Sequence, residues 1–188
     1  MFEILEKYTK KMTYNDYAAI DDGKRYELLN GELIMVPAPS FNHQRSNRNF
    51  FRIFDSYIND NSFGEVVFAP TDVILDDNNT VQPDILFISK KHRYKIDEDG
   101  GVHGAPDLVV EVISPSSKKM DRQIKKGLYE KYGVLEYWII DLKEKSAEVY
   151  ENIEGKFNLF SYAVEQGKLT SKLLLGFEVN LEDILPDL

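Results

Sequence analysis

Residues 108–113 read Leu-Val-Val-Glu-Val-Ile, an aliphatic run that contains one carboxylate, Glu111. A run that is apolar at consecutive positions is typical of a strand buried on both faces of a sheet. A carboxylate inside such a strand is costly to bury unless it is paired, protonated or bound to a metal ion. The alternative is an edge strand with Glu111 facing water, which the apolar residues on both faces disfavour. The run therefore predicts a sheet covered on both sides, with a carboxylate that needs a partner.

The patterns on either side of this strand predict a mixture of helices and strands. They comprise a short helix over 13–21, a hairpin over 26–36 around Asn30-Gly31, a helix over 41–60 capped by Ser40, strands within 64–75 and over 81–89, a helix over 118–132, and strands over 136–141 and 147–151. The Asn-Gly turn and the Ser cap are strong local signals for these elements. This order places the chain in the α/β or α+β class, with a mixed sheet flanked by helices.

The length of 188 residues predicts one domain, 1–188, that is large enough for a full core. We expect its core over about 40–151, preceded by the helix and hairpin of 13–36. Residues 157–163 and 168–175 predict a further hairpin at the C-terminal side, over 157–175. The polar segment 90–105 contains Gly100-Gly101 and predicts a mobile loop.

Composition excludes several classes of protein. The chain has no cysteine, three scattered histidines, none of the common nucleotide-binding or hydrolase loops, and no apolar run long enough for a membrane span. We expect a cytoplasmic protein without a signal peptide, whose chemistry uses carboxylates, lysines and an oxygen-bound metal ion. The net charge of −9 disfavours a protein held to nucleic acid by its overall field. Residues 86–131 are net basic and 141–188 net acidic, which either permits local anion binding or reflects solvated surface.

A second carboxylate, Asp84, lies in the predicted strand 81–89. Two strands joined by a loop can pair, and two neighbouring carboxylates repel unless a cation lies between them, as in a Mg²⁺ site. Asp107 shares a face with Glu111 but is about 13 Å away along the strand at ~3.3 Å per residue. We therefore expect Asp107 at a turn where the strand begins and not in the same site.

The helix over 118–132 carries Asp121, Lys125 and Tyr129 at a spacing of four, which puts them on one helix face. Lys125 could reach the two carboxylates and stabilise a phosphate or polarise a water. A plain surface pair between Asp121 and Lys125 is the equal alternative. Lys126 lies about 100° further round the helix and is the weaker candidate.

An ordered set of short strings resembles a known family. The set comprises Tyr26-Glu27-Leu28 before Gly31-Glu32-Leu33, His43 at a helix start, Gln82-Pro83-Asp84, the segment 106–115, Asp121-Arg122 with Lys125 and Tyr129, and the segment 136–141. Together they resemble the Uma family of bacterial restriction-endonuclease-like proteins, within the PD-(D/E)XK nuclease superfamily. The resemblance spans about residues 13–185 and implies a restriction-endonuclease-like mixed sheet with the N-terminal hairpin as an extension.

The resemblance also implies roles for individual residues. Asp84 and Glu111 match the acids that bind Mg²⁺ or Mn²⁺ in the superfamily. The lysine of that pattern falls on Ile113 here, so Lys125 on the following helix would supply the charge. Accessory candidates are Glu27, which would replace a glutamate missing from the helix over 41–60, His43, which could instead bond the backbone at the helix start, and Tyr129.

Two functions follow from this comparison. The first is a metal-dependent endonuclease that hydrolyses phosphodiester bonds of DNA. The second is a catalytically inactive protein of the nuclease fold, acting as a nucleic-acid-binding or assembly subunit. The net charge of −9 and the absence of a lysine at position 113 favour the inactive protein. The buried carboxylates favour the endonuclease, because an inactive protein has no reason to keep charges that are costly to bury. The exposed hairpins and aromatic residues are compatible with a homodimer.

Overall fold

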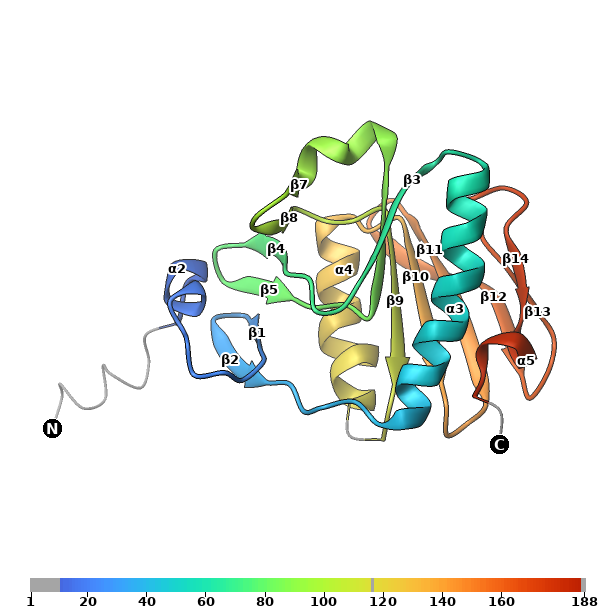
Figure 1. Ribbon diagram of the computed structural model, residues 1–188, viewed down its shortest axis with the longest axis horizontal. Coiled ribbons are helices and arrows are strands. Elements are labelled where there is room, and N and C mark those ends of the chain that lie inside the picture. The colour runs from blue at the N-terminus through green and yellow to red at the C-terminus, as the bar shows by residue number, and fades with distance from the viewer. Residues whose placement is uncertain (1–10, 116, 187–188) are drawn as a thin grey trace, which may run out of the picture.

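A computed structural model describes residues 11–115 and 117–186 (Figure 1). Six strands form what we call the central sheet, in the order β12-β11-β10-β9-β6-β3. Their bounds are β3 (Gly64–Phe68), β6 (Ile85–Ser89), β9 (Leu108–Ile113), β10 (Glu136–Asp141), β11 (Ser146–Ile153) and β12 (Lys156–Val164). β9 and β10 are parallel and the other neighbours are antiparallel. This sheet confirms the predicted mixed α+β architecture.

Helices cover both faces of the central sheet, as the aliphatic run in β9 predicts. α3 (Phe41–Asp60) lies on one face, and α4 (Lys126–Tyr132) lies on the other (Figure 1). Val110 and Val112 belong to the core cluster that contains the α3 side chains, whereas Val109 and Ile113 pack with the α4 side chains. Since strand residues alternate between faces, Glu111 points to the α4 side.

A second six-stranded sheet, the outer sheet, has the order β2-β1-β5-β4-β8-β7. Its strands are β1 (Tyr26–Leu29), β2 (Glu32–Met35), β4 (Val73–Asp76), β5 (Asn79–Val81), β7 (Ile96–Asp97) and β8 (Gly101–His103). The predicted Asn30-Gly31 turn joins β1 and β2, with φ of 53° and 80° at these residues. Because β1 pairs with β5, the hairpin is part of a larger sheet and not a simple extension. The short helix α2 (Tyr14–Ala18) precedes it and is capped by Thr13, as predicted.

Two predictions about the segment between α3 and β9 are wrong. Residues 81–89 do not form one strand, because β5 ends at Val81 and β6 begins at Ile85. The chain leaves the outer sheet and enters the central sheet at Gln82-Pro83-Asp84, where Pro83 has no N–H to donate to a ladder. Residues 90–105 are not a loop throughout, because they contain the 3₁₀ helix η1 (Lys90–Lys95) as well as β7 and β8.

The predicted hairpin over 157–175 does not form. β12 pairs with β11 across a turn at Glu154-Gly155, and β13 (Lys168–Thr170) pairs with β14 (Glu178–Asn180). The N–H groups of Lys172 and Leu173 donate to the carboxylate of Glu136 at 2.7 and 2.9 Å, so they are not available to a ladder with β12. The final helix, α5 (Leu181–Ile184), contacts α3.

The predicted helix after β9 contains a π-helix, η2 (Met120–Lys125), which continues into α4. Gly133 ends α4 in the left-handed conformation with φ 83°, as predicted for a C-cap. A short π-helical segment within a helix is frequent at functional sites. Here it buries both Asp121 and Lys125.

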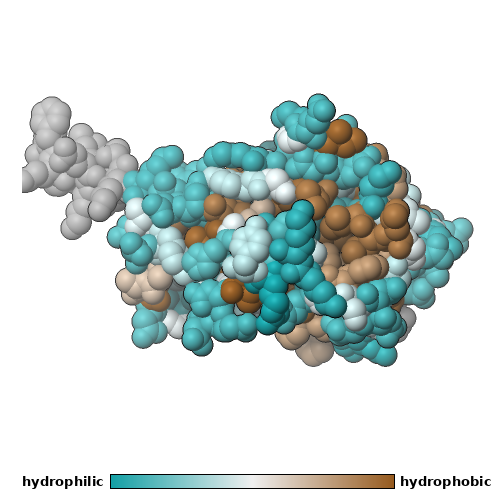
Figure 2. All heavy atoms as spheres, turned by 90° about the horizontal axis from the view of Figure 1, so that it is seen from above, coloured by the Kyte–Doolittle hydropathy of each residue, from teal (hydrophilic) through white to brown (hydrophobic). Residues whose placement is uncertain are grey.

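Among the described residues, no helix is long and apolar enough to cross a membrane. Figure 2 shows the molecule from above, where polar side chains cover most of the surface and apolar side chains gather on the right of the view. That is the side on which Figure 1 places β13, β14 and the end of α3.

Candidate active site

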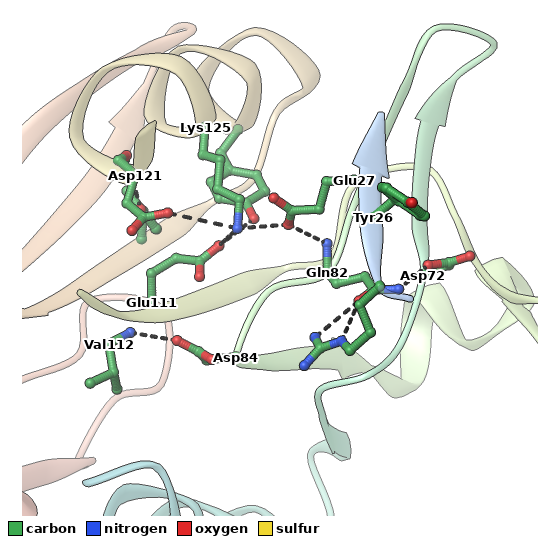
Figure 3. Close-up of polar contacts among 12 residues, drawn as sticks. Tyr26, Glu27, Asp72, Gln82, Asp84, Glu111, Val112, Asp121 and Lys125 are labelled. Carbon is green, nitrogen blue, oxygen red and sulfur yellow. Dashed lines mark hydrogen bonds and ion pairs between the residues drawn. The ribbon is translucent and has the colours of Figure 1, made fainter. Parts of the chain in front are cut away.

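A cavity of about 700 Å³ opens where the start of α3, the β1–β2 hairpin and η2 meet. Five charged side chains from four parts of the chain converge on it: Glu27 from β1, Asp84 from the residue just before β6, Glu111 from β9, and Asp121 and Lys125 from η2. Figure 3 shows how they point toward one another. The fold therefore brings together Asp84, Glu111 and Lys125, as predicted from the sequence.

Lys125 is the centre of this group. Its Nζ lies 2.8 Å from Oε1 of Glu27, 2.9 Å from Oε1 of Glu111 and 3.7 Å from Oδ1 of Asp121 (Figure 3). Burial alone would lower the pKa of Lys125, but the carboxylates of Glu111, Glu27 and Asp121 outweigh it and raise that pKa well above its ordinary value. The ammonium group is therefore held charged, and the alternative of a plain surface pair with Asp121 is wrong.

Lys126 points elsewhere. Its Nζ lies 3.3 Å from the centroid of the Tyr150 ring, and burial lowers its pKa. Lys126 does not line the cavity, so of the two lysines it is Lys125, the stronger candidate from the sequence, that faces it.

Glu111 is 3 % exposed and accepts two hydrogen bonds at one oxygen. Oε1 accepts from Nζ of Lys125 and, at 2.7 Å, from the hydroxyl of Tyr129. Burial raises the pKa of Glu111 well above its ordinary value, Lys125 opposes that shift, and the neighbouring carboxylates add to it. Burial likewise raises the pKa of Asp121. Tyr129, an accessory candidate, thus contacts the site through Glu111.

Asp84 is held by three donors. Its Oδ2 accepts from the backbone N–H of Val112 at 2.8 Å and lies 3.1 Å from Nε2 of His43, and its Oδ1 accepts from Nδ2 of Asn47 at 3.1 Å. Burial lowers the pKa of His43, but the bond and charge of Asp84 raise it overall. His43 therefore contacts the site, instead of only bonding the helix-start backbone.

Asn47 is a site residue that the sequence analysis missed. It lies one helical turn after His43, and its Nδ2 is 3.4 Å from Nδ1 of that histidine. The spacing of four residues from His43 is the signal that could have identified it.

Glu27 comes to the site from the outer sheet. It is 4 % exposed, and its Oε1 accepts from the backbone N–H of Gln82 at 2.8 Å as well as from Lys125. The residue just before Pro83-Asp84 thus fixes Glu27 beside the lysine. Gln82 belongs to one of the strings that resemble the family, but no role in the site was predicted for it.

Asp107 lies outside the cavity, as predicted. Its carboxylate accepts from the backbone N–H of Ser89 at 2.7 Å and lies 2.6 Å from Nδ1 of His92. These contacts hold the residue before β9 next to Ser89 at the end of β6. The third histidine, His103, lies 3.7 Å from exposed Asp97.

The carboxylate oxygens that line the cavity are ligands suited to a hard cation that keeps part of its water shell. Within residues 11–115 and 117–186, no three His, Asp or Glu side chains are grouped so that they could hold a metal ion. Mg²⁺ does not require such a cage, because it binds one or two carboxylates and keeps several waters. Asp84 and Glu111 both line the cavity, and Oε2 of Glu111 has no hydrogen bond in the described part of the chain. These two carboxylates are the residues that could hold such an ion.

Comparison with known proteins agrees with the fold and the resemblance. The architecture is that of a crystal structure from Anabaena variabilis, titled a "putative nuclease belonging to DUF820", with a TM-score of 0.75, 16% identity, and coverage of 92% of this chain and 97% of that chain. The chain belongs to the Uma2 family, described as "Putative restriction endonuclease", whose model matches residues 12–182. An uncharacterized protein from Synechocystis sp. is 26% identical over 148 residues, which cover 77% of this chain and 83% of the relative.

Proposed function

We propose that the protein is an endonuclease that hydrolyses phosphodiester bonds of DNA with the help of Mg²⁺ or Mn²⁺. The observation that carries the proposal is the charged Lys125, buried beside Glu111 and open to a cavity that Asp84 also lines. A structural ion pair does not need to face a cavity of this size. Membership of a family described as restriction endonucleases supports the same reaction class.

Asp84 and Glu111 would hold the metal ion, which when bound supplies charge for the phosphate and lowers the pKa of a bound water. Three donors fix the carboxylate of Asp84, and Tyr129 fixes that of Glu111. Burial raises the pKa of Tyr129 well above its ordinary value, so its hydroxyl keeps the proton that it donates. Both carboxylates therefore keep their geometry when substrate enters.

Lys125 would stabilise negative charge that develops on the phosphate oxygens during hydrolysis. A preorganised charge in a site shielded from water is worth more than the same charge in solution. The carboxylates around Lys125 keep it protonated throughout the neutral pH range, so it acts as a fixed charge and not as a base. Glu27 also contacts the ammonium group and helps to orient it.

The net charge of −9 is compatible with this function because basic residues are concentrated on α3, whose N-terminal end lines the cavity. From Phe41 to Phe54, α3 carries Arg45, Arg48 and Arg52 and no acidic residue. The N-terminal end of α3 lines the cavity through Ser40 and His43 and adds the positive end of a helix dipole. Arg48 and, from the outer sheet, Arg25 line the cavity, so a DNA phosphate would meet these two positive charges beside the carboxylates.

The second candidate is a nuclease-fold protein that binds nucleic acid without cleaving it. Its supporting observation is that Lys125 already pairs with carboxylates of the cluster, which partly satisfies their need for a cation. A protein of this kind would bind DNA equally with and without divalent ions.

The two candidates are separated by cleavage of supercoiled plasmid DNA in Mn²⁺. We expect the wild-type protein to nick the plasmid and Asp84→Asn to lose this activity. Asp107→Asn is the matched control, because Asp107 is a buried carboxylate outside the cavity. Absence of Mn²⁺-dependent nicking by the wild type, or equal nicking by Asp84→Asn, would refute the proposed reaction.

A further inference from the structure

One wall of the cavity is lined by apolar side chains that phosphodiester hydrolysis does not require. Met35 at the end of β2 is 60 % exposed, and Phe68 at the end of β3 is 59 % exposed. Phe51 of α3 also lines this side, together with Pro37, Pro39 and Ala69. A metal ion, a water and a phosphate need only polar groups. Large apolar side chains that line a cavity indicate a ligand with an apolar surface.

Phe68 is fixed relative to the carboxylates. It pairs with Ile85 in the central sheet, and the next N–H, that of Ala69, donates to the carbonyl oxygen of Asp84 at 3.0 Å. The ring of Phe51 lies 5.0 Å from the Phe68 ring at an interplanar angle of 80° and braces it. The aromatic wall and Asp84 are therefore parts of one rigid unit.

Arg25 supplies a positive charge at the same cavity. Its Nε and Nη2 donate to Oε1 of Gln82 at 3.2 and 3.0 Å. Gln82 is itself fixed, because its Nε2 donates to Oδ1 of Asp72 at 2.8 Å and its N–H donates to Glu27. In the described part of the chain Arg25 has no carboxylate partner, so a half-buried guanidinium is held in place by a neutral amide. Such a group is preorganised for an anion.

We propose that this cavity binds an unpaired DNA nucleotide, with its base against Phe68 and Met35 and a neighbouring phosphate on Arg25. A base inside a duplex is stacked and paired, so it can reach a wall of this kind only from a single strand or after it leaves the stack. The inference rests on the proposed function and defines its substrate class as single-stranded DNA, or duplex DNA with an unpaired nucleotide at the cleavage position.

The test measures binding by fluorescence anisotropy, with Ca²⁺ in place of Mg²⁺, to labelled single-stranded DNA, to a duplex of the same length, and to the single strand with abasic positions. We expect the single strand to bind more tightly than the blunt duplex. Phe68→Ala should weaken single-strand binding about 5-fold or more, because stacking on an aromatic ring contributes about 1–3 kcal/mol per base. The abasic strand should bind weakly to both proteins, with little difference between them.

Two further variants sharpen the test. Phe160→Ala is the matched control, since Phe160 is an exposed phenylalanine on β12 that does not line the cavity. It should bind like the wild type. Arg25→Met should weaken binding of both the normal and the abasic strand and reduce the salt dependence of binding, as expected for a lost phosphate contact.

The outcomes separate this inference from the proposed reaction. Equal binding of duplex and single strand, with no effect of Phe68→Ala, would overturn the unpaired-nucleotide site even if the plasmid is cleaved. Base-dependent binding that Phe68→Ala weakens would support the site even if no cleavage is found. A Phe68→Ala protein with unchanged DNA binding but an altered sedimentation coefficient would instead identify the wall as a contact between copies, which also overturns the inference.

Discussion

The Nζ of Lys125 lies 2.8 Å from Oε1 of Glu27 and 2.9 Å from Oε1 of Glu111, so one ammonium group joins the outer sheet to the central sheet. Both contacts are buried, and the two carboxylates belong to strands of different sheets, β1 and β9. A buried ion pair is costly to form and costly to break. This contact therefore couples the relative position of the two sheets to the geometry of the cavity.

The first prediction concerns Lys125→Met. Loss of the charge should lower the rate of plasmid cleavage by about 10²–10³-fold, as for removal of one preorganised donor. It also leaves buried carboxylates without their cation, which should lower the free energy of unfolding by about 3–5 kcal/mol. Single-turnover cleavage in Mn²⁺ at a temperature where circular dichroism shows a folded variant measures the rate.

Two control variants accompany this measurement. Lys126→Met should cleave at nearly the wild-type rate, because its ammonium group lies on the Tyr150 ring. Lys125→Arg keeps the charge and should lose less activity than Lys125→Met. Equal rates for Lys125→Met and Lys126→Met would show that Lys125 has no role in the reaction.

The second prediction concerns metal binding and needs no cleavage assay. A ligand at 100 times its dissociation constant stabilises the folded state by about 2.7 kcal/mol. For a chain of this length Mn²⁺ should therefore raise the unfolding midpoint by roughly 5–10 °C. Asp84→Asn should lose this shift, and Asp107→Asn should retain it. A shift of the same size in Asp84→Asn would place the ion elsewhere.

Sequence reasoning located the catalytic candidates because each carries a local signal. Glu111 stands out as the one charge in an aliphatic strand, and the spacing of four residues orients Lys125 together with Tyr129. The Asn30-Gly31 turn and the Ser40 cap fix the neighbouring elements in the same local way. Signals of this kind do not depend on how distant segments pair.

The parts that could not be predicted depend on distant pairing. The outer sheet exists because β1 pairs with β5 around Leu28 and Thr80, and no local pattern specifies that partner. The spacing of four puts Asp121 and Lys125 on one helix face, and both are buried, but no local pattern predicts that η2 is a π-helix. The prediction of a hairpin over 157–175 was wrong because the N–H groups of Lys172 and Leu173 donate hydrogen bonds to the carboxylate of Glu136, which is far away in the chain.

The third prediction tests that role of Glu136, which is fully buried. Its carboxylate accepts four hydrogen bonds, from Nε1 of Trp138 at 2.7 Å, from the hydroxyl of Ser171 at 2.7 Å, and from the N–H groups of Lys172 and Leu173. An amide at this position would direct an NH₂ group at donors. Glu136→Gln should therefore lower the free energy of unfolding by about 1–3 kcal/mol, the cost of one unsatisfied buried group.

The chain has a single tryptophan, so the fluorescence of Trp138 during denaturation in urea reports this change directly. Glu178→Gln, at an exposed glutamate of β14, should leave the midpoint unchanged. An unaltered midpoint in Glu136→Gln would show that the four bonds add no net stability.

The fourth prediction is that Glu111→Gln, in contrast to Glu136→Gln, stabilises the metal-free protein at neutral pH. An amide oxygen can still accept from Lys125 and Tyr129, which both donate to Oε1. The NH₂ group would take the place of Oε2, which accepts no hydrogen bond from the described residues. Lys125 keeps Glu27 and Asp121 as partners. The variant thus removes the cost of a buried charge while Lys125 and Tyr129 both keep an acceptor.

The sign of the pH dependence follows from the raised pKa of Glu111 in the folded state. Below the ordinary pKa of a glutamate, folded and unfolded wild-type protein both carry the proton, and the wild type and Glu111→Gln should unfold at similar temperatures. As the pH rises from there through the raised pKa, the folded wild type must give up a proton that it binds more tightly than the unfolded chain does, so it loses stability relative to the variant. Thermal unfolding in EDTA at pH 4 and at pH 8 measures the difference. A gap that is absent at pH 8, or that is larger at pH 4, would show that Glu111 is held by structural pairing and carries no strain that a metal ion could relieve.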